Sequence, residues 1–216
     1  MNRSIIITGT SYGLGKSLLD ILKNTEDIKI AISRSYSNGV DIKNKIYYKY
    51  MDLSKFTEFE NPILKTSNEI VFINNAITID PISNIVQLKK SDIDYAVRVN
   101  LLAPIFITNI LLNKKNPSAF LKVINITTTS AEIPGLSLYS STKKAIIEFF
   151  NTLAKEDEKV KISHIFPGII NTPLQNKLRN KNITDSKELF MRYKTDNLLK
   201  SSDEVAKKIL IKENLI

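Results

Sequence analysis

The chain contains no cysteine, and it has only one histidine and six glycines among its 216 residues. The absence of cysteine excludes disulfides, thiolate metal sites and cysteine nucleophiles. A single histidine excludes a metal centre built from several histidines. We therefore expect chemistry that depends on neither a bound metal nor a thiol.

Long hydrophobic runs are also missing from the sequence. At the amino terminus, residues 5–7 (III) lead directly into a glycine-rich turn, before a run of signal-peptide length can form. No stretch approaches the roughly 18–20 apolar residues that cross a bilayer. We expect a cytoplasmic protein without a membrane partner.

The formal net charge is +9, from 31 basic and 22 acidic residues. Nucleic-acid-binding proteins gather basic residues on one face, with aromatic residues between them. Here the lysines are scattered along the whole chain, which favours a solubilising surface and no nucleic-acid partner. The alternative, nucleic-acid binding, predicts strongly salt-dependent association with any duplex.

Short runs rich in isoleucine and valine alternate with longer amphipathic stretches. The runs predict buried strands at 4–8, 28–33, 46–52, 70–74, 121–127 and 160–166. The amphipathic stretches predict helices at 14–23, 91–113, 140–155 and 203–212. Strand alternating with helix requires crossover connections, so the predicted class is α/β: one Rossmann-type, doubly wound parallel sheet of six to seven strands with helices on both faces.

No repeat or linker divides the chain, and residues 1–216 are therefore predicted to form a single domain. The least regular segment is 174–202, which carries many charges between two ordered-looking parts. Loops of this length are often lids or binding loops. We interpret the segment either as a substrate-binding loop or as disordered.

The first predicted strand runs into residues 8–15 (TGTSYGLG), and a helix begins at once. Three of the six glycines fall within these eight residues. Glycine lets the backbone turn tightly and lets a pyrophosphate approach the N–H groups at a helix amino terminus. The segment predicts a dinucleotide-binding turn, and the alternative is an ordinary tight connection.

The second predicted strand ends at Arg34, and no aspartate or glutamate lies between Lys29 and Val40. An acidic side chain at this place would accept hydrogen bonds from a ribose 2′-hydroxyl and so favour NAD. Arg34 instead offers a fork of donors suited to a 2′-phosphate. This pattern favours NADP, although a surface arginine at a strand end is the alternative.

Residues 139–143 (YSSTK) open an amphipathic helix, and their spacing places Tyr139 and Lys143 on one face. A free tyrosine has a pKa near 10, too high for ready proton exchange at neutral pH. A neighbouring ammonium stabilises the phenolate and lowers that pKa. The pair is therefore a candidate acid or base.

Four segments match motifs of a known family in the expected order. Residues 8–15 match TGxxxGxG, residues 74–76 (NNA) match three of the four positions of NNAG, residues 139–143 match YxxxK, and residues 167–172 (PGIINT) match PGxxxT. From about residue 3 to 212 the sequence resembles the short-chain dehydrogenase/reductase family.

The resemblance implies catalytic roles for four residues. Tyr139 would exchange the substrate proton, Lys143 would lower the tyrosine pKa and bind the nicotinamide ribose, and Asn100 would hold a water in the proton relay. The family expects a serine at the end of the fifth strand that binds the substrate carbonyl. Alignment by strand end selects Thr128, with Thr127 and Ser130 as alternatives, because a threonine hydroxyl can donate the same bond.

The resemblance also implies a set of cofactor contacts. Within it Asp52 would contact the adenine and Thr172 the carboxamide side of the nicotinamide, while Asn74 would stabilise the central strand. Alternatively, Asp52 is a turn residue and Asn100 kinks its helix. Besides Tyr139 and Lys143, the implied contacts are Gly9, Ser11, Tyr12, Gly13, Leu14, Gly15, Arg34, Asp52, Leu53, Asn75, Ala76, Pro167, Gly168, Ile170 and Thr172.

The sequence departs from the family pattern at several places. Ile77 replaces the glycine after NNA, and Tyr12 stands where NADP-preferring members often have a basic residue. The family's seventh strand is absent or reduced to 210–216, which would leave one wall of the substrate pocket open. His164 is interpreted as a core or strand-end residue without chemistry.

Together these observations predict an NADP-dependent oxidoreductase that transfers a hydride between nicotinamide and a carbonyl or secondary alcohol of a small molecule. Residues 74–85 resemble the sepiapterin and benzil reductase branch, which fixes no substrate. Family members pair through the helices at 91–113 and 140–155, so a homodimer is expected. The alternative is a catalytically weak NADP-binding regulatory or scaffold protein, suggested by the short carboxy end and the threonine.

Overall fold

A seven-stranded sheet forms the centre of the protein, with strand order β3-β4-β2-β1-β5-β6-β7. The structure is a computed structural model that describes residues 2–56, 62–128, 133–180 and 184–216. Neighbouring strands are parallel, except that β3 pairs with β4 in the antiparallel sense. The strands are β1 (Arg3–Thr8), β2 (Ile28–Ser33), β3 (Gly39–Asp41), β4 (Ile46–Tyr50), β5 (Glu69–Asn74), β6 (Phe120–Ile126) and β7 (Val160–Ile165).

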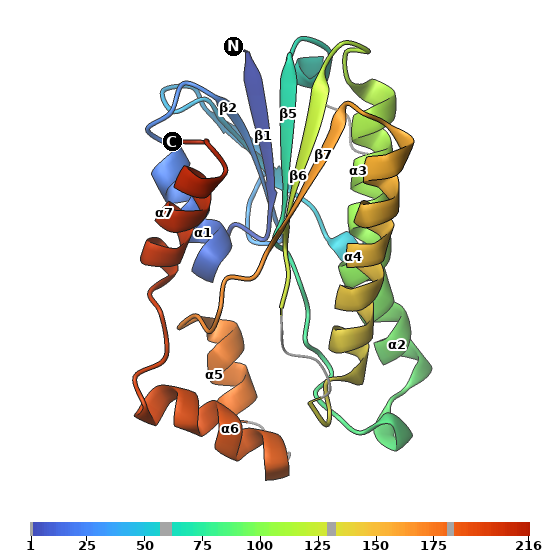
Figure 1. Ribbon diagram of the computed structural model, residues 1–216, viewed down its shortest axis with the longest axis vertical. Coiled ribbons are helices and arrows are strands. Elements are labelled where there is room, and N and C mark those ends of the chain that lie inside the picture. Colours follow the sequence, from blue (N-terminus) through green and yellow to red (C-terminus); the bar gives the residue numbers. More distant parts are fainter. Residues whose placement is uncertain (1, 57–61, 129–132, 181–183) are drawn as a thin grey trace.

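Helices cover both faces of the sheet, with α1 and α7 on one face and α3 and α4 on the other (Figure 1). Helices α5 and α6 lie beyond the carboxyl ends of the strands, at the bottom of Figure 1. The helices are α1 (Gly13–Leu22), α2 (Lys90–Val97), α3 (Ala103–Lys114), α4 (Ser137–Glu156), α5 (Pro173–Asn180), α6 (Thr184–Thr195) and α7 (Ser202–Lys212), with short helical segments η1 (Leu53–Lys55), η2 (Pro62–Lys65), η3 (Ile85–Gln87) and η4 (Arg98–Leu102).

The isoleucine run in β1 explains why this segment forms a central strand. Ile5 and Ile7 belong to the core beneath α1 and α7, whereas Ile6 belongs to the core beneath α3 and α4. All three are fully buried. Because successive side chains in a strand point to opposite faces, only a run that is apolar at every position can fill two cores.

The predicted fold class is confirmed: the sheet is a Rossmann-type, doubly wound sheet. The carboxy-terminal edge strand is absent, because β7 forms that edge and residues 213–216 form no strand. The seventh strand is instead β3, at the opposite edge, which the sequence analysis missed because it is short and mostly exposed. The segment 174–202 was expected to be irregular, but most of it lies in α5 and α6.

The helical stretch Lys90–Lys114 corrects a second expectation, that no segment is apolar enough to cross a membrane. By length and composition alone this stretch passes that test, with a mean hydropathy of 1.6 over its best window. Its inward side chains Val99, Ala103, Ile107 and Leu111 belong to the core. Packing in the core therefore accounts for its apolar composition.

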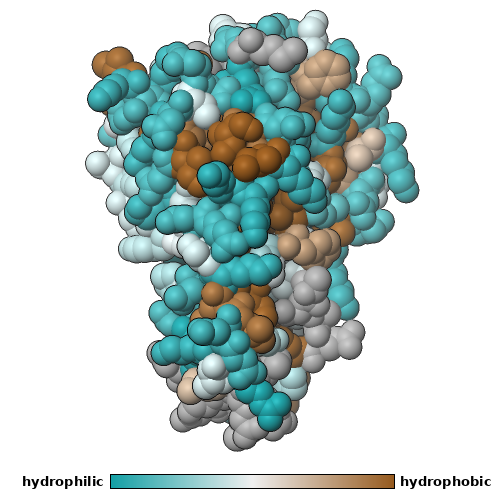
Figure 2. All heavy atoms as spheres, turned by 60° about the vertical axis from the view of Figure 1, so that its left-hand side comes forward, coloured by the Kyte–Doolittle hydropathy of each residue, from teal (hydrophilic) through white to brown (hydrophobic). Residues whose placement is uncertain are grey.

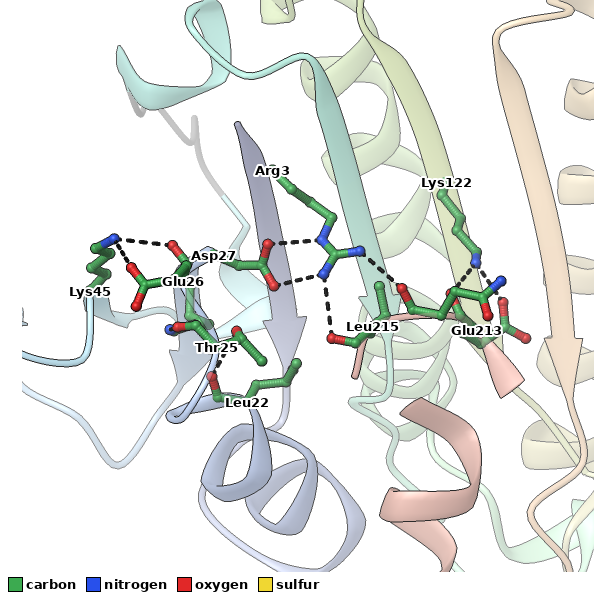
Figure 3. Close-up of polar contacts among 11 residues, drawn as sticks. Arg3, Leu22, Thr25, Glu26, Asp27, Lys45, Lys122, Glu213 and Leu215 are labelled. Carbon is green, nitrogen blue, oxygen red and sulfur yellow. Dashed lines mark hydrogen bonds and ion pairs between the residues drawn. The ribbon is translucent and has the colours of Figure 1, made fainter. Parts of the chain in front are cut away.

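The last residues are tied to the amino ends of the strands by polar contacts (Figure 3). Arg3 forms two hydrogen bonds with Asp27, of 2.9 and 2.8 Å, and also donates to the carbonyl oxygens of Asn214 and Leu215. The carboxylate of Glu213, 6% exposed, lies 2.9 Å from the ammonium of Lys122. These contacts fix the tail across the sheet in the absence of a further strand.

Candidate active site

The glycine turn lies between β1 and α1, and three of its positions tolerate no side chain. Gly9 and Gly13 have φ angles of +74° and +54°, which only glycine adopts without strain. A Cβ at Gly15 would lie 2.2 Å from the carbonyl oxygen of Gly9 and 2.4 Å from Nδ2 of Asn75. Glycine therefore lets the turn pack tightly at the amino terminus of α1, where it lines the cavity, and a turn of this kind fits a dinucleotide pyrophosphate.

The Asn-Asn-Ala segment after β5 is bound to this turn. Nδ2 of Asn75 donates to the carbonyl oxygens of Thr8 and Gly9, at 2.9 and 3.2 Å. The hydroxyl of Thr8 accepts hydrogen bonds from the backbone N–H groups of Asn75 and Ala76. Asn74 points the other way along the sheet and donates to Asn125 at 2.9 Å. The two adjacent asparagines therefore bind different neighbours: Asn75 binds the glycine turn and Asn74 binds Asn125 on β6.

The ends of β2 and β4 form the part of the site predicted to hold the adenosine. Arg34 donates from Nη1 to the hydroxyl of Tyr95, on α2, at 2.9 Å. Asp52 accepts two hydrogen bonds from Ser54 and caps η1. Burial alone raises the pKa of Asp52, but the Ser54 hydrogen bonds and the nearby charges of Arg34 and Lys55 lower it overall.

Tyr139 lies in the first turn of α4 and is hydrogen-bonded by Thr128, just beyond the end of β6. Burial raises the pKa of Tyr139, and the hydrogen bond from the Thr128 hydroxyl opposes that rise. The hydroxyl of Thr127 is buried and has no hydrogen-bond partner in the part of the chain that the structure describes. Ser130, the other alternative, lies outside the described residues. Thr128 is thus the threonine that touches the tyrosine.

Lys143 follows one turn later on α4 and is buried. Its ammonium donates to the carbonyl oxygen of Ile126, at the end of β6. Burial lowers the pKa of Lys143 to about 8. The expectation that Lys143 lowers the tyrosine pKa differs from the structure, in which the burial of Tyr139 sets the direction of its shift.

Asn100 lies in η4, a π-helical segment between α2 and α3. Its side chain accepts from the backbone N–H of Thr78 and donates to the carbonyl oxygen of the same residue, both at 2.9 Å. It also donates to the hydroxyl of Thr142, on α4 between Tyr139 and Lys143, at 3.2 Å. Asn100 therefore ties the loop after β5 to the helix that carries the tyrosine.

The segment after β7 closes the site against the glycine turn. A Cβ at Gly13 would lie 3.1 Å from Cγ2 of Thr172, so these two residues are in contact range. Gly168 has a φ angle of +76°. Ile170 pairs with Lys200 in an isolated bridge, which anchors the connection between β7 and α5.

Most of these groups surround one cavity of about 860 Å³ at the carboxyl ends of the strands. Every predicted cofactor contact lines it, and so do Tyr139, Lys143 and Thr128. Asn100 is not among the described lining residues, and it acts on the wall through Thr78. Among the residues that the structure describes, no group of metal ligands gathers.

The other end of the cavity lies largely in the segment 174–202, which is interpreted from the sequence as a substrate-binding loop or as disordered. This end is lined by residues from the loop after β5 and from α5 and α6: Thr78, Ile79, Asp80, Leu174, Gln175, Lys177, Leu178, Phe190 and Tyr193. No motif marks these positions, and only the apolar spacing within α5 and α6 could have indicated them. Tyr95, which holds Arg34, was missed for the same reason.

Comparisons with known proteins show the family of the chain. Residues 3–183 match the model of the short chain dehydrogenase family. A benzil reductase ((S)-benzoin forming) of Bacillus cereus is 31% identical over 229 residues, covering 96% of this chain and 92% of the relative. An NADP-dependent 3-hydroxy acid dehydrogenase of Schizosaccharomyces pombe is 27% identical, covering 79% and 72%.

The fold is likewise shared with solved structures. A crystal structure of a short-chain dehydrogenase/reductase from Saccharomyces cerevisiae aligns with a TM-score of 0.74 at 21% identity, covering 94% of this chain and 86% of that one. The chain belongs to the short-chain dehydrogenase family. It is accordingly an oxidoreductase of a family that uses a nicotinamide cofactor.

Proposed function

We propose that the protein is an NADP-dependent carbonyl reductase, which transfers a hydride between nicotinamide and a carbonyl or secondary alcohol of a small molecule. The observation that carries the proposal is the hydrogen bond between Thr128 and Tyr139 at the wall of the cavity that the glycine turn also lines. A relative whose name is benzil reductase supports a carbonyl substrate. The name of a second relative supports NADP.

Bound NADPH supplies the hydride in this reaction. The hydroxyl of Tyr139 gives its proton to the substrate oxygen, and the hydroxyl of Thr128 donates a second hydrogen bond that orients the carbonyl. Lys143 holds the cofactor ribose and passes a proton towards Tyr139. Asn100 keeps the loop and α4 in register and holds a water in the relay, as the family resemblance implies.

Arg34 is proposed to bind the 2′-phosphate of NADP. The hydrogen bond to Tyr95 holds its guanidinium at the cavity wall, where no carboxylate follows β2 before Asp41. A guanidinium binds a phosphate through paired, charge-assisted hydrogen bonds. The same position would give a ribose 2′-hydroxyl of NAD no acidic acceptor.

We also propose a homodimer formed through α2, α3 and α4. Phe106 on α3 is 46% exposed and Ile93 on α2 is 37% exposed, although both are large apolar side chains. A partner that covers them would remove apolar surface from water. The mass in solution, measured by light scattering, tests this proposal.

The substitution Tyr139→Phe tests the catalytic proposal. It removes the proton donor while keeping the ring, and we expect the reduction of an activated diketone by NADPH to fall roughly 100- to 10,000-fold. NADPH affinity should be unchanged. The control Tyr193→Phe removes a hydroxyl from another wall of the same cavity and should retain most activity. Equal rates for Tyr139→Phe and the parent would show the proposal to be wrong.

The substitution Arg34→Leu tests the cofactor proposal separately. Loss of the charged hydrogen bonds to the 2′-phosphate should raise the KM for NADPH by about tenfold. The KM for NADH should change little, because NADH has no phosphate at that position. An unchanged ratio of the two KM values would contradict NADP selection by Arg34.

A further inference from the structure

The end of the cavity beyond Tyr139 combines a cluster of apolar side chains with a few polar ones, among them Gln175 and the pair of Asp80 and Lys177. Its core cluster consists of Ile79, Ile82, Leu136, Leu178 and Phe190, with the rings of Tyr139 and Tyr193 packed against it. The ring centroids of Phe190 and Tyr193 are 5.9 Å apart and the rings meet at 71°, an edge-to-face contact. At the height of α5 and α6, hydrophobic residues also reach the surface among hydrophilic ones (Figure 2).

The charges on the described part of the cavity wall are held in different ways. Arg34 donates to Tyr95 near the predicted adenosine site, and Lys143 donates to a backbone carbonyl. At the substrate end the cation is Lys177, on α5, and its ammonium is paired with the carboxylate of Asp80. Asp80 belongs to the loop after β5, 97 residues away in sequence, so the ion pair joins two walls of the cavity.

We propose that Asp80 is a specificity-determining residue: by neutralising Lys177 it makes the site accept neutral carbonyl compounds with apolar substituents and discriminate against carboxylates. This inference rests on the proposed carbonyl reductase function. A carboxylate that enters must compete with Asp80 for Lys177 and approach the Asp80 charge. It must also give up its bound water where it packs against Leu136 and Phe190, because these apolar side chains cannot replace the lost hydrogen bonds.

The ion pair is better suited to selecting substrates than to stabilising the fold. The Asp80 and Lys177 side chains are 42% and 46% exposed, and pairs in such surroundings add little to folding. Replacing either partner should therefore leave the protein folded. Such a replacement would, however, change the net charge at the mouth of the substrate end.

The test compares methyl benzoylformate with benzoylformate, two probes with the same ketone that differ in one charge. The parent enzyme should reduce the ester with the higher kcat/KM. In Asp80→Asn the freed Lys177 should raise kcat/KM for the acid about fivefold, mainly through KM, while the value for the ester stays within about twofold. Added salt should erode the gain, because it screens exposed charges.

Two controls assign the effect to this ion pair. Lys177→Met in the Asp80→Asn background removes the cation and should abolish the gain for the acid. Asp20→Asn removes the carboxylate that pairs with Lys16 and Lys23 on α1, outside the cavity wall, and should change neither substrate. Melting temperatures of all variants show whether each is folded.

Calorimetric titration of both probes into the NADP-loaded protein gives a second readout that needs no turnover. Tighter binding of the acid by Asp80→Asn than by the parent supports the proposal. The proposal is overturned if the parent binds and reduces the acid as well as the ester, or if Asp80→Asn brings no gain for the acid. Failure of the proposed function differs: neither probe is reduced, and Tyr139→Phe behaves as the parent does.

Discussion

Two buried ion pairs at the amino ends of the strands differ from the buried lysine of the active site at the carboxyl ends. At the amino ends of the strands, Arg3 is paired with Asp27 and Lys122 with Glu213, and these side chains are at most 21% exposed (Figure 3). The hydrogen bond to Asp27 raises the pKa of Arg3. Each buried charge in these two pairs therefore meets an opposite charge within the chain.

At the carboxyl ends, two buried polar groups, those of Lys143 and Thr127, have no charged partner among the described residues. Lys143 is buried but donates to a carbonyl oxygen, not to a carboxylate, and burial lowers its pKa to about 8. The hydroxyl of Thr127 has no partner at all among the described residues. A buried polar group without a matched partner costs stability. The two ion pairs therefore stabilise the fold, whereas Lys143 and Thr127 keep donors for a ligand.

The largest effect should come from distorting the tightly packed glycine turn at the carboxyl end of β1. In Gly15→Ala the new Cβ would overlap the carbonyl oxygen of Gly9 and Nδ2 of Asn75, so the turn must move. We expect NADPH affinity, measured by fluorescence titration, to fall at least about 100-fold, and the free energy of unfolding to drop by about 3 kcal/mol.

The matched control is Gly39→Ala, on the edge strand β3. Nothing lies within 4 Å of a Cβ at Gly39, and its φ angle is not positive. This variant should bind NADPH as the parent does and should unfold at a similar denaturant concentration. If Gly15→Ala also kept its NADPH affinity, the glycine turn would not be the pyrophosphate site.

A smaller effect, confined to stability, is expected at the amino end. Glu213→Gln keeps the shape of the side chain but leaves Lys122 without its carboxylate, and the hydrogen bond from Ser163 would meet a neutral acceptor. Because Lys122 is 21% exposed, we expect a loss of about 2 kcal/mol in urea unfolding, less than for a fully buried pair. The kcat at low temperature should be unchanged.

Glu204→Gln is the control for this prediction. Glu204 forms an exposed pair with Lys208 one turn away on α7, with side chains 54% and 70% exposed. Such exposed pairs contribute little to stability, because water and salt screen them. Equal losses for the two variants would contradict the view that the tail contacts stabilise the fold.

Much of the fold could be predicted because local patterns carry it. The run Ile5-Ile6-Ile7 specifies a strand buried on two faces without any tertiary information, and six of the seven strands follow from such runs. The strand Gly39–Asp41 has no apolar run, and it exists because β4 offers it a free edge. Helices α5 and α6 could not be predicted, since their apolar residues pack on the loops around the cavity.

The candidate site could be predicted where a sequence motif indicates its role: residues 8–15 for cofactor binding and residues 139–143 for proton transfer. The contact between Thr128 and Tyr139 was expected from strand alignment, but only geometry separates Thr128 from Thr127. The partner of Lys143 and the ion pair of Asp80 with Lys177 depend on chain segments brought together by folding. No periodicity records such contacts.

An effect that depends on pH is expected from the charge state of Lys143, and it sharpens the comparison between the two ends. Its folded pKa of about 8 lies below its ordinary value of 10.5. If the ammonium takes part in the reaction, kcat/KM for reduction should fall as pH rises through about 8. Lys143→Met should be slow, and its kcat/KM should not fall over this range.

The same group should also make stability depend on pH. Between about pH 8 and 10.5 the folded chain binds fewer protons at Lys143 than the unfolded chain does. The free energy of unfolding of the parent should therefore rise relative to that of Lys143→Met over this window. The exposed control Lys208→Met should show neither change. If kcat/KM of the parent stays constant through about pH 8, the ammonium of Lys143 takes no part in the reaction.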